Sequence, residues 1–109
     1  MSEVKYRLSY LPIFYEDLNE TVAYIYHKLK NPKAANDLID KVESAILKRQ
    51  PNAESFEPYY SIKERKYKYY RIYVDNYMIF YVVIDDDPAN LIMEVRRFLY
   101  SGRNVKDLV

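Results

Sequence analysis

Residues 68–100 read KYYRIYV-DN-YMIFYVVI-DDDPA-NLIMEVRRFLY. The three long runs in this stretch are rich in β-branched and aromatic residues, which predicts three strands. Asp75-Asn76 is a two-residue connection whose residues tolerate positive φ, and it predicts a tight β-hairpin. Residues 77–84 are apolar almost without a break, as in a strand that is covered on both faces. The stretch therefore predicts an antiparallel meander of three strands.

The N-terminal half carries one more strand pattern and two helix patterns. Residues 4–10 alternate apolar and polar, which predicts a strand with one buried face. Apolar spacings of three and four predict an amphipathic helix over about residues 12–30. Asn31, as N-cap, and Pro32 then predict the start of a second helix that ends before Pro51. The expected inward residues are Leu11, Phe14, Leu18, Val22, Ile25 and Leu29 in the first helix, and Ala35, Leu38, Val42, Ala45 and Ile46 in the second.

The order of these elements predicts an α+β fold in one domain spanning residues 1–109. Because the turn between the helices is very short, the helices must form an antiparallel hairpin. We expect this hairpin to cover one face of a sheet of about four strands, and residues 104–109 to add one helical turn. Residues 51–66 form a long connection, and we expect Phe56, Tyr59 and Tyr60 to hold it against the domain.

The composition excludes several kinds of site. The chain has no cysteine, one histidine and one glycine, which removes thiol catalysis, zinc–thiolate sites, multi-histidine metal sites and glycine-rich phosphate loops. Asp85-Asp86-Asp87 lacks the ligand spacing of a calcium loop and is interpreted as a solvated turn. We therefore expect no metal and no cofactor.

The charge and hydropathy of the chain also narrow its location and partners. Lysine and arginine number 17 against 16 acidic residues, which weakens the case for a nucleic-acid-binding protein. The longest apolar run is far shorter than the roughly 20 residues that span a bilayer. Since no apolar run follows the first residues, we also expect no secretory signal and a cytoplasmic protein.

Arginine and tyrosine side chains on the predicted sheet are the candidate functional residues. If Ile72 and Val74 face the helices, then Tyr69, Arg71 and Tyr73 lie on the opposite face. These exposed side chains can form a charge ladder or a binding surface, and the last strand contributes to both interpretations.

In the last strand, strict alternation groups Met93, Val95 and Leu99 on one face and Glu94, Arg96 and Phe98 on the other. The same alternation places Arg97 on the core side unless a bulge intervenes. Arg71, Arg96 and Glu94 then form either a cross-strand charge ladder or part of an arginine–tyrosine cluster that grips an anionic or polypeptide partner. The pattern leaves both interpretations open.

Taken together, the chain resembles the RelE/ParE superfamily of bacterial toxins, the growth-arresting halves of type II toxin–antitoxin modules. The resemblance covers nearly the whole length and rests on the order and spacing of several pieces. These pieces are Tyr6-Arg7-Leu8, Asp17-Leu18, Ala34-Ala35, Tyr70-Arg71, residues 76–81 and residues 95–104.

This resemblance implies one of two mechanisms. RelE-like members are ribosome-dependent endoribonucleases that use basic residues of the sheet and a C-terminal arginine and tyrosine, whereas ParE-like members bind and poison DNA gyrase. Arg71 and Arg103 match RelE-like basic positions, but Met78 and Tyr73 stand where two further basic residues would be. The later tyrosine of the RelE-like set has no counterpart, although Tyr100 lies nearby in the sequence.

The loss of the RelE-like arginine at Met78 matters because phosphoryl transfer depends on positive charge at the scissile phosphate. The two long helices are also more ParE-like. We therefore expect a ParE-like gyrase inhibitor whose partner-binding residues are Arg71, Arg96, Arg97, Tyr100 and Arg103.

Two alternatives remain. In a RelE-like enzyme acting on the ribosome and mRNA, Arg71 and Arg103 would stabilise the phosphate and Tyr100 would transfer a proton. In an inactive family member, the chain would only bind its antitoxin. The resemblance implies a cognate antitoxin protein in every case, and we expect no direct DNA binding without it.

Overall fold

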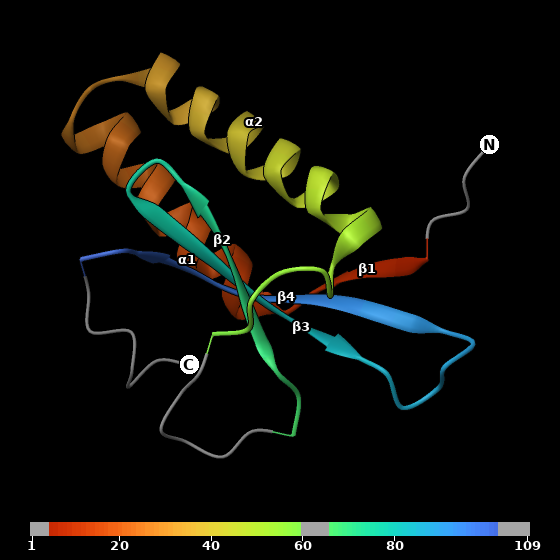
Figure 1. Cartoon of the computed structure of the whole chain (residues 1–109). Coiled ribbons are helices and arrows are strands. Elements are labelled where there is room, and N and C mark those ends of the chain that lie inside the picture. Colours follow the sequence, from red (N-terminus) through yellow and green to blue (C-terminus); the bar gives the residue numbers. More distant parts are fainter. Residues whose placement is uncertain (1–4, 60–65, 103–109) are drawn as a thin grey trace.

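The structure, a computed structural model, describes residues 5–59 and 66–102. Its elements are β1 (Tyr6–Tyr10), α1 (Pro12–Ala23), the π-helical segment η1 (Tyr24–Lys28), α2 (Pro32–Arg49), the 3₁₀ turn η2 (Gln50–Asn52), β2 (Tyr69–Val74), β3 (Tyr77–Ile84) and β4 (Leu91–Tyr100). The strands form one sheet in the order β1-β4-β3-β2, and both helices cover the same face of it (Figure 1). This arrangement confirms the predicted α+β fold. The predicted turn over residues 104–109 lies outside the described residues.

The sheet is mixed because β1 joins the meander in parallel. β1 pairs with β4 from Leu91 to Val95, while β2–β3 and β3–β4 are antiparallel. Leu11 ends this pairing by donating its N–H to the Val95 carbonyl at 2.9 Å, and the chain then turns into α1. The second half of β4 is therefore left for α1, rather than β1, to cover.

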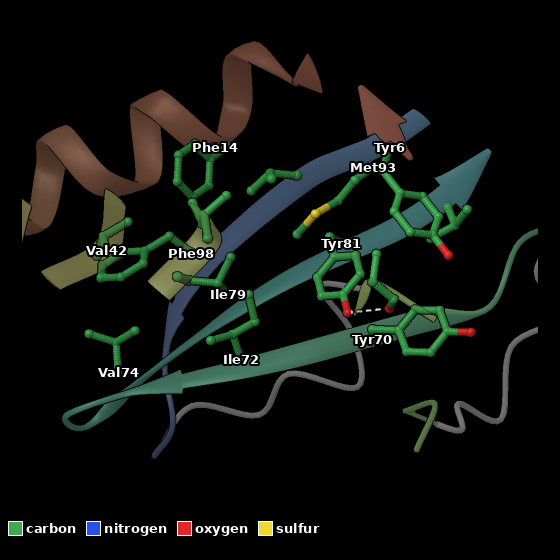
Figure 2. Close-up of a cluster of buried hydrophobic side chains, with 14 of the residues drawn as sticks. Tyr6, Phe14, Val42, Tyr70, Ile72, Val74, Ile79, Tyr81, Met93 and Phe98 are labelled. Carbon is green, nitrogen blue, oxygen red and sulfur yellow. Dashed lines mark hydrogen bonds between the residues drawn. The ribbon is translucent and has the colours of Figure 1, made fainter. Parts of the chain in front are cut away.

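The main core lies between the helices and the sheet. Phe14 from α1 and Val42 from α2 pack against Ile79, Tyr81 and other buried side chains of the strands (Figure 2). The Tyr81 hydroxyl donates to the Ala53 carbonyl at 2.6 Å, so this fully buried ring has a polar partner. Burial of these side chains confirms the predicted inward stripe over most of both helices.

Leu29 departs from that stripe, because 56% of it is exposed. The helix widens at η1, where the Leu29 N–H donates to the carbonyl of Tyr24, five residues earlier. The spacing of three and four residues holds only for a helix with 3.6 residues per turn, so it places Leu29 wrongly after this change.

A second apolar cluster lies on the outer face of the sheet, away from the helices. Tyr69, Met78 and Phe80 are buried there, and Tyr59 packs on them from the long connection. The Tyr59 ring centroid lies 5.3 Å from that of Phe80. Tyr59 thus holds the connection against the sheet as predicted, and β3 is covered on both faces. Tyr60 lies outside the described residues.

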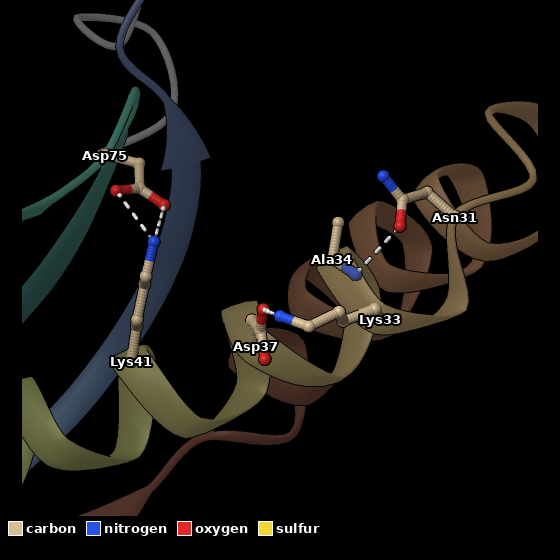
Figure 3. Close-up of polar contacts among 6 residues, drawn as sticks. All are labelled: Asn31, Lys33, Ala34, Asp37, Lys41 and Asp75. Atoms are coloured by element: carbon tan, nitrogen blue, oxygen red, sulfur yellow. Dashed lines mark hydrogen bonds and ion pairs between the residues drawn. The ribbon is translucent and has the colours of Figure 1, made fainter.

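The hairpin prediction at Asp75-Asn76 is confirmed. Val74 pairs with Tyr77, and Asp75 adopts a φ of 52°. Lys41 of α2 pairs with the Asp75 carboxylate at 3.1 Å, which links the helix to the turn (Figure 3).

A β-bulge in β4 changes the predicted faces. Phe80 pairs with Arg97 and Tyr81 pairs with Val95, so Arg96 is the extra residue. The inserted residue reverses the alternation that follows it. As a result Phe98 lies on the helix side with Met93 and Val95, and Leu99 lies on the outer face. The sequence-based grouping of Leu99 with Met93 and Val95, and of Phe98 with Glu94 and Arg96, was wrong for this reason.

Asn31 is expected to contribute about 1 kcal/mol to stability as the N-cap of α2. Its side-chain oxygen accepts the Ala34 N–H at 3.1 Å (Figure 3). We expect Asn31→Ala to lower the free energy of unfolding by that amount in urea titrations. Asn36→Ala, at an exposed position inside the same helix, serves as the matched control. An equal loss in both variants would contradict the capping role.

Candidate functional site

Arg97 lies at the free edge of β4 and is bound by α1. Its Nε donates to Asp17 Oδ2 at 2.8 Å and its Nη2 donates to Oδ1 at 3.0 Å. Asp17 Oδ2 also accepts the Phe98 N–H at 3.1 Å. These contacts raise the pKa of Arg97 above its ordinary value, chiefly through the hydrogen bonds to Asp17. The bulge therefore places Arg97 at the edge of the sheet, in contact with α1, and not in the core.

Arg71 lies on the outer face, as the alternation of β2 predicts. Its guanidinium carbon lies 5.1 Å from the Tyr59 ring centroid and 5.5 Å from that of Tyr73. Both rings are near enough to hold this cation by cation–π contact. Arg49 supports the strand from the other side, because its Nη1 donates to the Arg71 carbonyl at 3.2 Å.

Arg96 shares the outer face but is tied to two neighbours. Its Nε donates to Glu94 Oε1 at 2.8 Å, and its Nη1 donates to the Tyr69 hydroxyl at 3.1 Å. Burial lowers the pKa of Arg96, but these hydrogen bonds outweigh that effect and raise it. Glu94 and Arg96 therefore pair along β4 itself and not across strands, and Arg71 contacts aromatic rings, so these three residues do not form the cross-strand charge ladder.

Tyr100 lies on the helix side of the sheet, at the end of β4. It pairs with Tyr77, whose ring stacks on Phe98 at 4.9 Å in the core. The centroids of Tyr77 and Tyr100 are 5.9 Å apart in an edge-to-face arrangement. Arg71 and Tyr100 therefore occupy opposite faces. Arg103 lies outside the described residues.

Asp17 is the residue that the sequence-based site omitted. It entered the sequence analysis only as part of a resemblance, since an acidic residue in an amphipathic helix is usually solvent-exposed. The one signal in the sequence was indirect: strict alternation placed Arg97 on the core side, where a guanidinium needs an acidic partner.

Other classes of site find no support in the described part of the chain. Residues 5–59 and 66–102 contain no cluster of three or more histidine, cysteine or acidic side chains placed to hold a metal ion. Within the same ranges, no helix is both long and apolar enough to cross a bilayer. The pKa values of Tyr6, Tyr10, Tyr67, Tyr77 and Tyr81 are raised, away from neutrality.

Comparison with known families identifies the class of protein. Residues 8–104 match the family described as the ParE toxin of type II toxin–antitoxin systems, parDE. Because this match spans most of the 109 residues, the chain belongs to the ParE toxin family. Membership implies a toxin component with an antitoxin partner. A comparison with curated proteins finds no match.

Proposed function

We propose that this ParE-family toxin arrests growth in the cytoplasm by binding DNA gyrase, and that it does not cleave RNA. The main support is the separation of Arg71 and Tyr100, which lie on opposite faces of the sheet. A phosphoryl-transfer site needs its cation and its proton-transfer group within reach of the same phosphate. The sheet prevents these two side chains from forming such a site.

The environment of Met78 supports the same proposal. Met78 occupies the place of a RelE-like arginine and is buried among Tyr69, Phe80 and Leu99. The two arginines of β4 form ion pairs with acidic side chains, Arg96 with Glu94 and Arg97 with Asp17. Among residues 5–59 and 66–102, the outer face thus combines aromatic area with arginines that already contact acidic or aromatic side chains, which suits contact with a protein more than with RNA.

Arg71 is our central candidate for the gyrase contact. It is partly exposed between Tyr59 and Tyr73, and arginines and tyrosines dominate the energetics of many protein interfaces. Arg96, Tyr100 and Arg103 remain candidates for contacts with gyrase or antitoxin. For Arg97 we propose a structural role, since its guanidinium binds Asp17.

Arg71→Glu is expected to weaken inhibition of purified gyrase at least about tenfold, because it reverses the central charge of the proposed interface. The measurement is DNA supercoiling and gyrase-dependent DNA cleavage at increasing toxin concentration. Lys33→Glu is the matched charge reversal, at an exposed site on α2, and we expect it to change inhibition less than twofold.

A parallel assay on translating ribosomes separates the alternatives. Cleavage of mRNA by the wild-type toxin, without inhibition of gyrase, would overturn the proposal in favour of a RelE-like enzyme. Absence of both activities, together with tight antitoxin binding, would identify an inactive member. After induction in cells, the proposal requires thymidine incorporation to stop before amino-acid incorporation.

A further inference from the structure

A shallow cavity of about 390 Å³ lies on the helix side, at the end of the sheet opposite the N-terminus of α1. It is lined by Glu20, Thr21, Tyr24, Tyr77 and Tyr100. These residues come from the last turns of α1, the first position of η1, the start of β3 and the end of β4, which lie on the same side of the molecule (Figure 1). None of the roles proposed above requires these residues to form a cavity.

Three tyrosine rings give this cavity its character, and we call it the tyrosine cage. Tyr77 is fixed by stacking on the core residue Phe98, and Tyr100 meets it edge to face. Tyr24 and Tyr100 are 55% and 51% exposed, unlike the buried tyrosines of the core. Large rings held partly in solvent present π faces to a ligand, and π faces carry negative potential.

One carboxylate of the cavity lining, that of Glu20, adds to this negative potential. Glu20 precedes Tyr24 by one helical turn, so both side chains point to the same face of the helix. Burial, followed by the potentials of Tyr100, Asp75 and Tyr24, raises the pKa of Tyr77. Lys41 neutralises Asp75 at 3.1 Å. Within the described ranges, Glu20 has no ion-pair partner and no cation stacks on the three rings.

The Tyr100 ring lies against Gly102, in space that a larger residue would need. A Cβ atom at residue 102 would lie 2.5 Å from Tyr100 Cε2, far inside van der Waals contact. The only glycine of the chain therefore allows the Tyr100 ring to lie back over the backbone. On the other wall, the wide turn of η1 begins at Tyr24 and sets where this ring leaves the helix.

We propose that the tyrosine cage binds the guanidinium group of an arginine side chain from a partner protein. A guanidinium can stack on the tyrosine faces while it donates two hydrogen bonds to the Glu20 carboxylate. An anionic group would be repelled by Glu20, and an aliphatic group would bury this carboxylate without a partner. The proposal concerns the chemistry of the bound side chain and stands whether or not gyrase is the partner.

The first test uses two ligands of nearly the same shape, of which one carries the guanidinium charge and its full set of donors and the other does not. Full-length ¹⁵N-labelled protein is titrated with acetyl-arginine methylamide and, separately, with its neutral near-isostere acetyl-citrulline methylamide. We expect saturable shifts at Glu20, Tyr24, Tyr77 and Tyr100 with the arginine probe, and at least about fivefold weaker binding of citrulline. Equal binding of the two probes, shifts centred elsewhere or no saturation at tens of millimolar would each overturn the proposal.

Variants then test the individual walls of the cage. Glu20→Gln and Tyr24→Leu are expected to weaken binding of the arginine probe severalfold. Glu16→Gln and Tyr26→Leu make the same changes at exposed positions outside the cavity, and binding should stay at the wild-type level.

Gly102→Ala should also weaken binding, because it displaces the Tyr100 ring while leaving all cage side chains present. If Glu20→Gln binds as tightly as the wild type, the proposal is wrong. Melting temperatures verify that each variant is folded.

Discussion

Replacing Asp17 with alanine is expected to lower the free energy of unfolding by about 3 kcal/mol. The Asp17 carboxylate accepts two hydrogen bonds from the Arg97 guanidinium and one from the Phe98 N–H. The side chains of Arg97 and Asp17 are only 17% and 12% exposed, so water cannot fully replace these contacts. The variant leaves a poorly hydrated cation and an unpaired backbone N–H at the edge of β4, and both carry a desolvation penalty.

Urea unfolding followed by circular dichroism measures this loss. Asp37→Ala is the matched control, since Asp37 pairs with Lys33 on α2 while the two side chains are 50% and 86% exposed. We expect a change within about 0.5 kcal/mol there, because exposed ion pairs contribute little. A double-mutant cycle with Arg97→Ala should show a coupling energy of about 1–3 kcal/mol. If Asp17→Ala and Asp37→Ala unfold at the same urea concentration, Asp17 does not hold α1 to the sheet.

The elements that the sequence predicts are those with strong local signals. The Asp75-Asn76 turn and the continuous apolar run of β3 fix the hairpin and its central strand. Asn31 and Pro32 likewise mark the start of α2. In each case a few adjacent residues determine the backbone, so tertiary contacts do not change the outcome.

The faces of β4 could not be predicted because they depend on a single inserted residue. Nothing local to Arg96 marks it as the bulge, since the reason for the insertion lies elsewhere. With the bulge, Phe98 enters the core and Arg97 reaches Asp17. Without it, a guanidinium would be buried against apolar side chains, which is costly. The energetic reason is thus a contact between residues 80 positions apart.

The candidate site depends on the same bulge. Arg71 lies before it in the chain, on β2, and its face follows correctly from simple alternation. Tyr100 lies after it, and the reversal places its ring on the helix side beside Tyr24. Simple alternation therefore predicts the faces of a regular strand such as β2, but in β4 only the register shows which face each side chain takes and which side chains meet.

Alkaline pH is expected to destabilise this protein by several kcal/mol, because folding raises the pKa of buried tyrosines. Tyr6 is the strongest case: burial, and then the hydrogen bond from its hydroxyl to Glu54 Oε1 at 2.7 Å, raise its pKa from 10.0 to about 12. Burial is also the main cause of the raised pKa of Tyr10, Tyr77 and Tyr81. Each of these groups keeps its proton in the folded state at a pH where the unfolded chain has lost it.

The direction of the effect follows from proton linkage. A raised pKa favours the protonated folded state, so this stability is fully present below about pH 10 and is lost as pH rises through the folded value. With the pKa of Tyr6 raised from 10.0 to about 12, the loss of stability from Tyr6 alone reaches about 2 kcal/mol by pH 12. Urea unfolding at a series of pH values should therefore show a constant midpoint up to about pH 9.5 and a steep fall above it. Tyr6→Phe should make that fall less steep, because the variant lacks the tyrosine whose pKa rises to about 12 while Tyr10, Tyr77 and Tyr81 still titrate. Tyr26→Phe, at an exposed position, should leave the slope unchanged. A midpoint independent of pH up to about 11.5 would show that these tyrosines ionise as readily in the folded protein as in the unfolded chain.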